Sequence, residues 1–327
     1  MTPTMCEKMN NIKAQIIFRL LSVKGVGTVK AHKIFASLKN LYSKPDEDQM
    51  IKTIKESLND ELFEIFQSDK RSFSGEDERI GFITLFDDEY PDSLKSLGDH
   101  APLVLSYIGN ADLLNKNSVG FCGSRKASEK GISVTRDCAE QLVRKGFVLV
   151  SGYAAGVDFT THRTALENRG ETIVVIAEGI NNFRIKSELK QLWDWNKILV
   201  ISEFLPGSAW SVSNAMQRNG TIVALSNAMI LIESSANGGS MDAGKKALEM
   251  KKPLYAPFYE GMPESAVGNR ILIEKGAIKL GRKKETGRAN MSKIIAAQTP
   301  ADLTAEAVCE QKVQTGLFEI FETNGKE

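Results

Sequence analysis

Four short glycine-containing segments of the sequence have the residue types that could hold a phosphate group. Three of them follow a run of apolar residues and precede a helical pattern, and the other enters an apolar helix just ahead of such a run. Glycine lets the backbone approach a ligand closely, and the amino end of a helix offers free N–H groups to an anion. The four segments together indicate a surface that binds a phosphate-bearing ligand.

The first segment contains Gly123, Ser124 and Arg125, with Ser128 at the start of the helical pattern that follows. The Arg125 guanidinium can clamp a phosphate through two parallel hydrogen bonds. The same residues fit an ordinary strand-to-helix turn with a solvated arginine, and so short a motif leaves both interpretations open.

The second segment is rich in small residues, from Ser151 and Gly152 to Gly156, and Asp158 then begins a helix. Small side chains indicate close backbone packing or a ligand against the loop. Asp158 is expected to cap N–H groups at the helix start. His162 lies one turn later on the same face, where it could hydrogen-bond Asp158, and a structural role is expected for it rather than a catalytic one.

The third segment places Gln217, Arg218 and Asn219 at the entrance to an otherwise apolar helix. These donors could form a fork aimed at phosphate or at a base edge, or they could be a solvated helix start.

The fourth segment begins with Glu233 at the end of an apolar strand, where a buried carboxylate needs a partner. Arg218 and a cluster of backbone N–H groups are both candidates for that partner. Gly239 and Ser240 then open a helix, which gives a second candidate anion cradle.

The elements that must position these segments alternate between strands and helices. Short apolar runs predict strands at 81–86, 104–108, 119–122, 148–150, 173–176, 198–201, 229–232 and 254–256. Helical patterns at 129–145, 158–169 and 241–250 lie between them, with Gly146 and Gly170 placed as carboxyl-terminal caps. Continuous rather than alternating apolar runs are typical of parallel strands covered on both faces. We therefore predict a doubly wound, Rossmann-like α/β fold with a mostly parallel sheet.

Two further regions flank this part of the chain. Residues 1–75 have helical apolar spacing broken by a glycine turn at 24–27, which predicts a small helical N-terminal domain. Residues 80–280 form the predicted Rossmann-like domain. Residues 281–327 are expected to be a basic linker with a short helical segment at 308–321.

The composition limits the kind of protein this can be. Apolar residues make up 42% of the chain, enough for a sizeable core, and the net charge is only +1, so any nucleic-acid site must be a local patch. Four scattered cysteines without a CxxC pair, and only three histidines, argue against a structural zinc. No apolar run could span a membrane and the first residues lack a signal-peptide core, so a cytoplasmic protein is expected.

In their order along 80–280, the segments resemble the DNA-processing protein A (DprA/Smf) family. The matching residues are Gly123-Ser124-Arg125 with Ser128, Ser151-Gly152 through Gly156-Val157-Asp158, His162-Arg163, Ser202-Glu203, Arg218-Asn219, Glu233 and Gly239-Ser240. Gly25-Val26-Gly27 and its flanking helices resemble a helix-hairpin-helix or SAM-like module, whose glycine turn can offer N–H groups to DNA phosphates or serve as a packing module.

The resemblance implies a non-catalytic protein that binds single-stranded DNA without sequence preference and has no cofactor. It also implies a homodimer and a partnership with a RecA-type recombinase in DNA uptake or recombination. By carry-over, Arg125 would contact phosphate, with Arg218 and Arg163 as further phosphate contacts. The pocket would be lined by Gly123, Ser124, Gly152, Gly156, Arg218, Asn219, Gly239 and Ser240. Ser128, Ser151 and Gln217 are also expected to contact the DNA.

The sequence also departs from the family pattern. Ala155 stands where a basic residue is usual, and Ala215 and Met216 replace a Phe-Pro pair. The lost ring could have stacked on a base, and Trp210 and Phe204 are candidates to replace it.

Two other functions compete with DNA binding. A nucleotide-derivative sensor or phosphoribohydrolase-like enzyme could use Glu233 beside the glycine-rich helix start. A dehydrogenase is set aside, because the first segment lacks GxGxxG and no acidic residue clearly closes a strand about 20 residues later.

Overall fold

The structure is a computed structural model that describes residues 5–41, 44–69, 77–258, 262–263 and 266–298. The chain forms two compact units, Met1–Ala289 and Asn290–Glu327. In the second unit the described residues contain one helix, α11 (Ser292–Gln298). The helical segment predicted at 308–321 lies outside the described residues.

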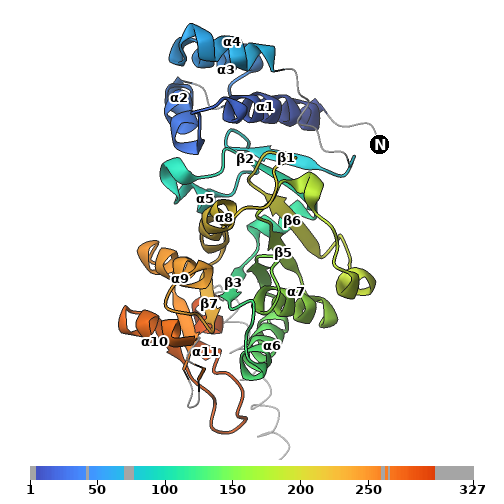
Figure 1. The fold of residues 1–327 in the computed structure, drawn as a ribbon. Coiled ribbons are helices and arrows are strands. Elements are labelled where there is room, and N and C mark those ends of the chain that lie inside the picture. The colour runs from blue at the N-terminus through green and yellow to red at the C-terminus, as the bar shows by residue number, and fades with distance from the viewer. Residues whose placement is uncertain (1–4, 42–43, 70–76, 259–261, 264–265, 299–327) are drawn as a thin grey trace, which may run out of the picture. The chain divides into compact units, whose positions relative to one another are not determined.

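One mixed sheet organises the first unit (Figure 1). Its described strands are β1 (Gly81–Thr84), β2 (Val104–Gly109), β3 (Ser118–Gly123), β4 (Val148–Ser151), β5 (Thr172–Val175), β6 (Ile198–Ser202), β7 (Ala228–Ile232), β8 (Leu254–Pro257) and β9 (Ile278–Leu280). Their order is β1-β2-β6-β5-β4-β3-β7-β8-β9. All pairings from β6 to β9 are parallel, while β1 and β2 run antiparallel to their neighbours. The predicted mostly parallel, Rossmann-like sheet is confirmed.

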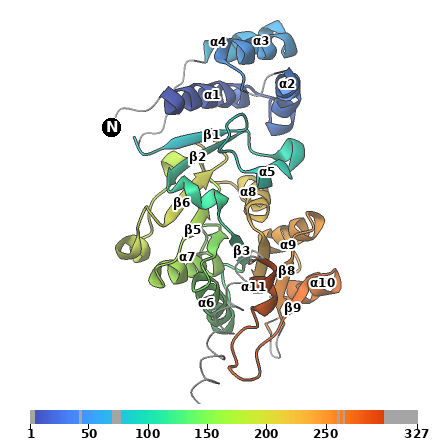
Figure 2. The ribbon, with the colours of Figure 1, turned by 180° about the vertical axis from the view of Figure 1, so that it is seen from behind.

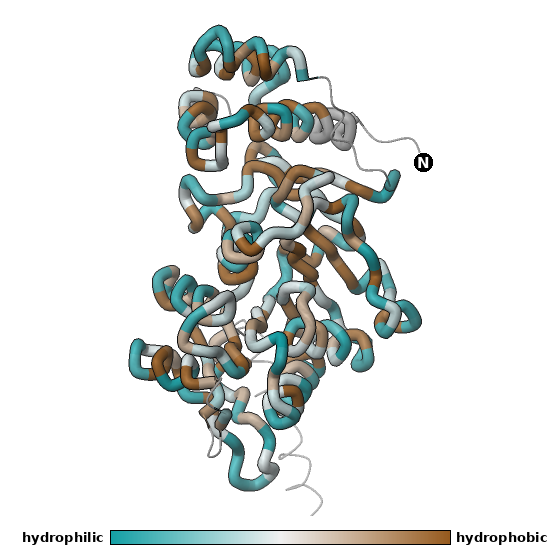
Figure 3. Tube along the Cα trace, viewed as in Figure 1, coloured by the Kyte–Doolittle hydropathy of each residue, from teal (hydrophilic) through white to brown (hydrophobic). Residues whose placement is uncertain are grey.

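Helices cover both faces of this sheet, as Figures 1 and 2 show from opposite sides. They are α5 (Asp92–Lys95), α6 (Glu129–Val143), α7 (Val157–Glu167), α8 (Val212–Leu225), α9 (Gly239–Glu249) and α10 (Val267–Glu274). In β5, Ile173 and Val175 join the core that α8 and α9 complete, whereas Val174 packs with α7 on the other face. Both faces are therefore apolar, and Figure 3 shows the central strands as mostly hydrophobic along their length.

The eight predicted strands are confirmed to within about two residues at each end. β9 was missed because it has only three residues and carries the exposed Lys279 at its centre. Gly146 adopts the left-handed conformation expected of a helix cap, with φ of 76°. The same prediction for Gly170 was wrong, because Arg169, with φ of 55°, takes that conformation instead.

The described N-terminal residues form the predicted helices α1 (Met5–Ser22), α2 (Thr28–Leu41), α3 (Glu47–Ser57) and α4 (Asp60–Ser68). These helices share an apolar core with β1 and β2. Phe18 packs edge-on against Phe82, with 5.8 Å between ring centroids, and a buried ion pair joins Lys13 to Asp87 at 3.1 Å. The domain boundaries near residues 75 and 281 stay predictions.

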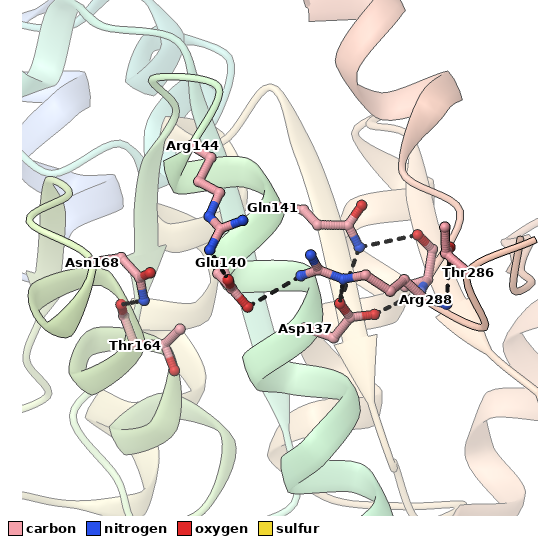
Figure 4. Close-up of polar contacts among 9 residues, drawn as sticks. Asp137, Glu140, Gln141, Arg144, Thr164, Asn168, Thr286 and Arg288 are labelled. Carbon is pink, nitrogen blue, oxygen red and sulfur yellow. Dashed lines mark hydrogen bonds and ion pairs between the residues drawn. The ribbon is translucent and has the colours of Figure 1, made fainter.

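The end of the first unit is fastened to α6 by the polar cluster in Figure 4. Arg288 Nε donates to Asp137 at 2.5 Å, and Arg288 Nη2 donates to Glu140 at 3.1 Å. The backbone N–H of Ala289 also donates to Asp137, at 2.6 Å. Charge-assisted bonds of this kind hold the loop after β9 against the helix.

Among the described residues, we find no helix whose length and apolar character would let it span a membrane.

Candidate functional site

A pocket of about 400 Å³ lies where the winding of the sheet reverses, at the carboxyl ends of β3 and β7. β3 pairs with β4 on one side and with β7 on the other. The strands that follow β3 directly, β4 to β6, therefore extend the sheet in one direction, and β7 to β9 extend it in the other. Ligands of open parallel sheets bind at such switch points. The predicted site residues that line the pocket are Gly123, Ser124, Arg125, Asp158, Arg218, Asn219, Glu233, Gly239 and Ser240.

The other predicted site residues do not line this pocket. Ser128, Ser151, Gly152, Gly156 and His162 lie next to the lining and hold it in place through the contacts described below. Arg163 is on α7, where it forms an ion pair with Glu167 at 2.7 Å. Gln217 lines a separate pocket on the opposite side of α8.

Arg125 and Trp210 form the exposed rim of the pocket. The guanidinium carbon of Arg125 lies 5.5 Å from the centre of the Trp210 ring, within the range of a cation–π contact. Trp210 is 48% exposed, which leaves ring surface open to a ligand. Phe204, the other candidate for the missing aromatic residue, is buried and is not part of the lining.

Arg218 lies deeper than the sequence suggested. Its side chain is buried, and Nη1 donates to the backbone oxygen of Val175 at 2.8 Å. A Cβ atom on Gly152 would lie 1.9 Å from Arg218 Nη1 and 2.4 Å from Asp158 Oδ2, so only glycine fits between these two side chains. Burial lowers the pKa of Arg218, and the Asp158 carboxylate opposes that shift. Phosphate contact by Arg218, as by Arg163, stays a prediction.

Asp158 and His162 stabilise the second glycine segment, but the hydrogen bond considered between them does not form. The Asp158 carboxylate accepts hydrogen bonds from Ser151 Oγ at 3.0 Å and from the backbone N–H of Ala154 at 3.2 Å. Ala154 precedes α7, so the prediction that Asp158 caps the first N–H groups of the helix was wrong. The buried His162 ring instead places Nε2 2.6 Å from the oxygen of Gly152. Burial lowers the pKa of His162 to about 4, so the ring is neutral near pH 7.

Glu233, for which the sequence left two partners open, meets the amino end of α6. The side chain is 1% exposed and accepts hydrogen bonds from the backbone N–H of Ser128 at 2.7 Å and from Ser128 Oγ at 2.5 Å. Its backbone has φ of 50°, a conformation uncommon outside glycine. A carboxylate with both oxygens bonded to the amino end of α6 acts as a helix cap.

The amino end of α9 remains open toward the pocket. Gly238 precedes the helix and provides no side-chain cap, so the first N–H groups are available to an anion. Asn219 Nδ2 donates to the oxygen of Gly239 at 3.0 Å and to Asp242 at 3.1 Å, which ties α8 to this helix start. Among the described residues, no group of three or more His, Cys, Asp or Glu side chains is arranged to hold a metal ion.

The burial of Glu203 and the raised pKa of its carboxyl were not predicted from the sequence. It follows β6, and its Oε2 accepts a hydrogen bond from Thr221 at 2.6 Å. Within the described structure, Glu203 Oε1 and Arg218 Nε have no hydrogen-bond partner. Burial raises the pKa of Glu203 to about 7. Because Glu203 interacts electrostatically with Arg218, the net charge of this buried pair next to the pocket depends on pH.

Replacing Glu203 with glutamine is expected to stabilise the chain at about pH 8, by up to about 3 kcal/mol, with little change near pH 4. The pKa of this carboxyl is 4.5 in an ordinary setting and about 7 here, so between these values the folded state binds a proton that the unfolded state has lost. The free energy of unfolding therefore falls as the pH rises through this window. Chemical denaturation across pH checks it. A difference in the free energy of unfolding between wild type and variant that stays constant across this pH window would contradict the raised pKa of Glu203.

Fold and pocket together define a Rossmann-like α/β protein with a pocket at the switch point of its sheet. The chain belongs to the DNA recombination-mediator protein A family, whose model matches residues 81–288.

Sequence relatives agree with this assignment. DNA processing protein DprA of Streptococcus pneumoniae is 34% identical over 217 residues, which is 65% of this chain and 75% of that protein. Protein Smf of Synechocystis is 31% identical over 202 residues, which is 60% of this chain and 50% of that protein.

Solved structures agree as well. The crystal structure of DprA from Streptococcus pneumoniae covers 86% of this chain and 95% of its own, with a TM-score of 0.69 and 27% identity. DNA processing protein A from Helicobacter pylori, whose structure addresses its single-stranded DNA binding mode, has a TM-score of 0.54 and 24% identity. It covers 66% of this chain and 94% of its own, and at that identity it supports the fold.

Proposed function

We propose that the chain binds single-stranded DNA in the switch-point pocket, without sequence preference and without catalysing a reaction on it. The observation that carries the proposal is the Arg125–Trp210 rim above the open amino end of α9. An aromatic ring for stacking beside cationic and N–H groups for phosphate is the combination that single-strand binders use. The Helicobacter pylori relative, which binds single-stranded DNA, supports the same ligand.

The size and chemistry of the pocket support the finer parts of this proposal. A volume of about 400 Å³ admits one or two unpaired nucleotides, whereas a base within a duplex would have to leave its stack to enter. Stacking and phosphate contacts carry no sequence information. Because Glu233 is committed to capping α6, the phosphoribohydrolase alternative loses its candidate catalytic carboxylate.

The biological setting rests on the family alone. Its description as a recombination mediator supports delivery of the bound strand to a RecA-type recombinase in the cytoplasm, and we propose a homodimer on the same ground.

Fluorescence anisotropy with labelled single-stranded and duplex oligonucleotides across a salt series tests the proposal. We expect the single strand to bind more tightly, with the logarithm of the affinity falling linearly with the logarithm of salt by about 0.7 per phosphate contact. Equal affinity for duplex, or no binding, would refute it. A melting temperature raised by a mononucleotide, without oligonucleotide binding, would favour the nucleotide-sensor alternative.

Replacing Trp210 with alanine should weaken single-strand binding by about 1–3 kcal/mol, roughly fivefold to 150-fold, because one base loses its stacking partner. The folded state should be little affected, since the ring is half exposed. Trp210→Phe keeps a ring and serves as the matched control, with most of the affinity retained. Anisotropy titrations at one salt concentration compare the three proteins. Unchanged affinity in the alanine variant would exclude stacking on this ring.

A further inference from the structure

A second concave surface lies against the other side of α8. It has a volume of about 940 Å³ and is formed by the start of α2, the turn at His100, the first turns of α8, and α9. We call it the lysine groove, and its residues used below are Lys30, Lys33, His100, Met216, Gln217 and Lys246. Lys30 and Lys33 precede residue 81, where the match to the family model begins.

The groove and the switch-point pocket lie on opposite sides of α8 and share one lining residue. Met216 lines both of them, while Ala215 lines the pocket and Gln217 lines the groove. Successive residues of a helix point in directions about 100° apart, so this helix start separates the two sites by little more than its own width. A strand that leaves the pocket over the first turns of α8 therefore reaches the groove directly.

The charge of the groove suits a phosphate backbone. Lys30 and Lys33 are exposed and one turn apart on α2, and neither has a hydrogen bond or ion pair with any described residue. The described residues that line the groove include no carboxylate. Lys246 stands at the boundary, where its ammonium donates to the backbone oxygen of Met216 at 2.5 Å and to Asp242 at 2.8 Å.

The α2 wall of the groove is held in a fixed position. His32, between the two lysines in sequence, is buried, with Nε2 2.8 Å from the backbone oxygen of Ala101. Phe35 packs edge-on against Phe86, with 5.5 Å between ring centroids. The buried face of α2 thus packs on the α/β part, and its lysines remain on the outer face. Cations on a fixed wall lose little conformational freedom of the backbone when they bind.

We propose that the lysine groove is a second single-stranded DNA subsite, which holds the phosphate backbone of the strand where it leaves the switch-point pocket. The proposal rests on the proposed function of that pocket. It also accounts for Gln217, a predicted DNA contact that lies in the groove instead of the pocket.

A length series of oligothymidylates, from about 4 to about 16 nucleotides, tests the subsite with the full chain. The variant Lys30→Glu/Lys33→Glu should bind the shortest strands as wild type does. For the longest strands we expect about tenfold weaker binding and a salt slope lowered by about 0.7 for each phosphate that the variant no longer neutralises. The control Lys145→Glu/Lys275→Glu reverses two exposed lysines that precede β4 and β9, at the opposite edge of the sheet, and should match wild type.

Two results would overturn the subsite. One is wild-type affinity of the Lys30→Glu/Lys33→Glu variant for every length, and the other is the same loss at every length, which a general electrostatic effect would produce. Lys30→Gln/Lys33→Gln, which removes charge without reversing it, should show a smaller loss confined to long strands. Arg125→Glu separates the two proposals. If the pocket binds DNA, that variant loses affinity at all lengths, and if it does not, short strands fail to bind even to wild type.

Discussion

Replacing Gly156 with alanine is expected to lower the free energy of unfolding by about 2–5 kcal/mol and to abolish single-strand binding. Gly156 has φ of 74°, and an added Cβ would lie 2.3 Å from the backbone oxygen of Ser124 and 2.7 Å from that of Arg125. Neither oxygen can move without displacing the first glycine segment. The substitution therefore strains its own backbone and shifts Arg125 away from the pocket rim.

Gly146 provides a control that also has a positive φ but lacks the close contacts of Gly156. Its φ of 76° is nearly the same, but a Cβ there would meet nothing within 4 Å. Gly146→Ala should cost only the left-handed backbone strain, about 1–2 kcal/mol, and leave DNA binding intact. Urea denaturation and anisotropy titrations compare the two variants with wild type. Equal losses of stability in Gly156→Ala and Gly146→Ala would show that the close approach of the first two glycine segments does not add to the cost of the Gly156 substitution.

Replacing Arg125 with glutamate should weaken single-strand binding by about 1.5–3 kcal/mol, roughly tenfold to hundredfold at low salt. The substitution exchanges a phosphate clamp for a repelling charge and removes the cation beside Trp210. Arg125 is exposed, so the melting temperature should hardly change. Arg136→Glu, an equal charge reversal at an exposed arginine on α6 outside the pocket lining, is the control and should retain wild-type affinity.

The salt dependence of binding adds an independent criterion. The Arg125→Glu variant should show a shallower dependence of affinity on salt, because fewer counterions are released when it binds. A loss of affinity with an unchanged salt slope would mean that Arg125 acts on the structure of the pocket instead of on phosphate.

Much of the fold could be predicted because the strands are continuously apolar. That pattern follows from burial on both faces of the sheet, and it located eight strands. β9 was not predicted, because three residues with a central lysine carry no such pattern. The left-handed conformation of Arg169 was not predicted, because it is uncommon for arginine. The adjacent Gly170 was expected to adopt it instead.

The location of the candidate site was also predictable, because the carboxyl ends of parallel strands meet at one edge. The roles of individual residues were harder to predict, since they depend on contacts between distant segments. Glu233 meets Ser128, 105 residues earlier, only because β7 lies beside β3 and α6 follows β3. The choice between Trp210 and Phe204 likewise depends on burial, which their sequence neighbours do not reveal.

The proposed path of DNA also explains why the buried charges lie where they do. Arg218, which lines the pocket, and Glu203 are buried, while Arg125 and the two groove lysines are exposed. Exposed cations can exchange counterions for phosphates, whereas buried ones tune the local field and fix the lining. A net charge of only +1 is compatible with this arrangement, because the binding surface is local.

The central claim is that the switch-point pocket holds single-stranded DNA, and ultraviolet crosslinking to an iodouracil-substituted oligonucleotide tests it most directly. Mass spectrometry then locates the attached nucleotide in the chain. We predict crosslinks at Trp210 and within 123–125, at the rim of the pocket. Trp193 and Trp195 lie outside this lining and serve as internal controls. Crosslinks confined to those two tryptophans, or absent from the pocket segments, would contradict the claim.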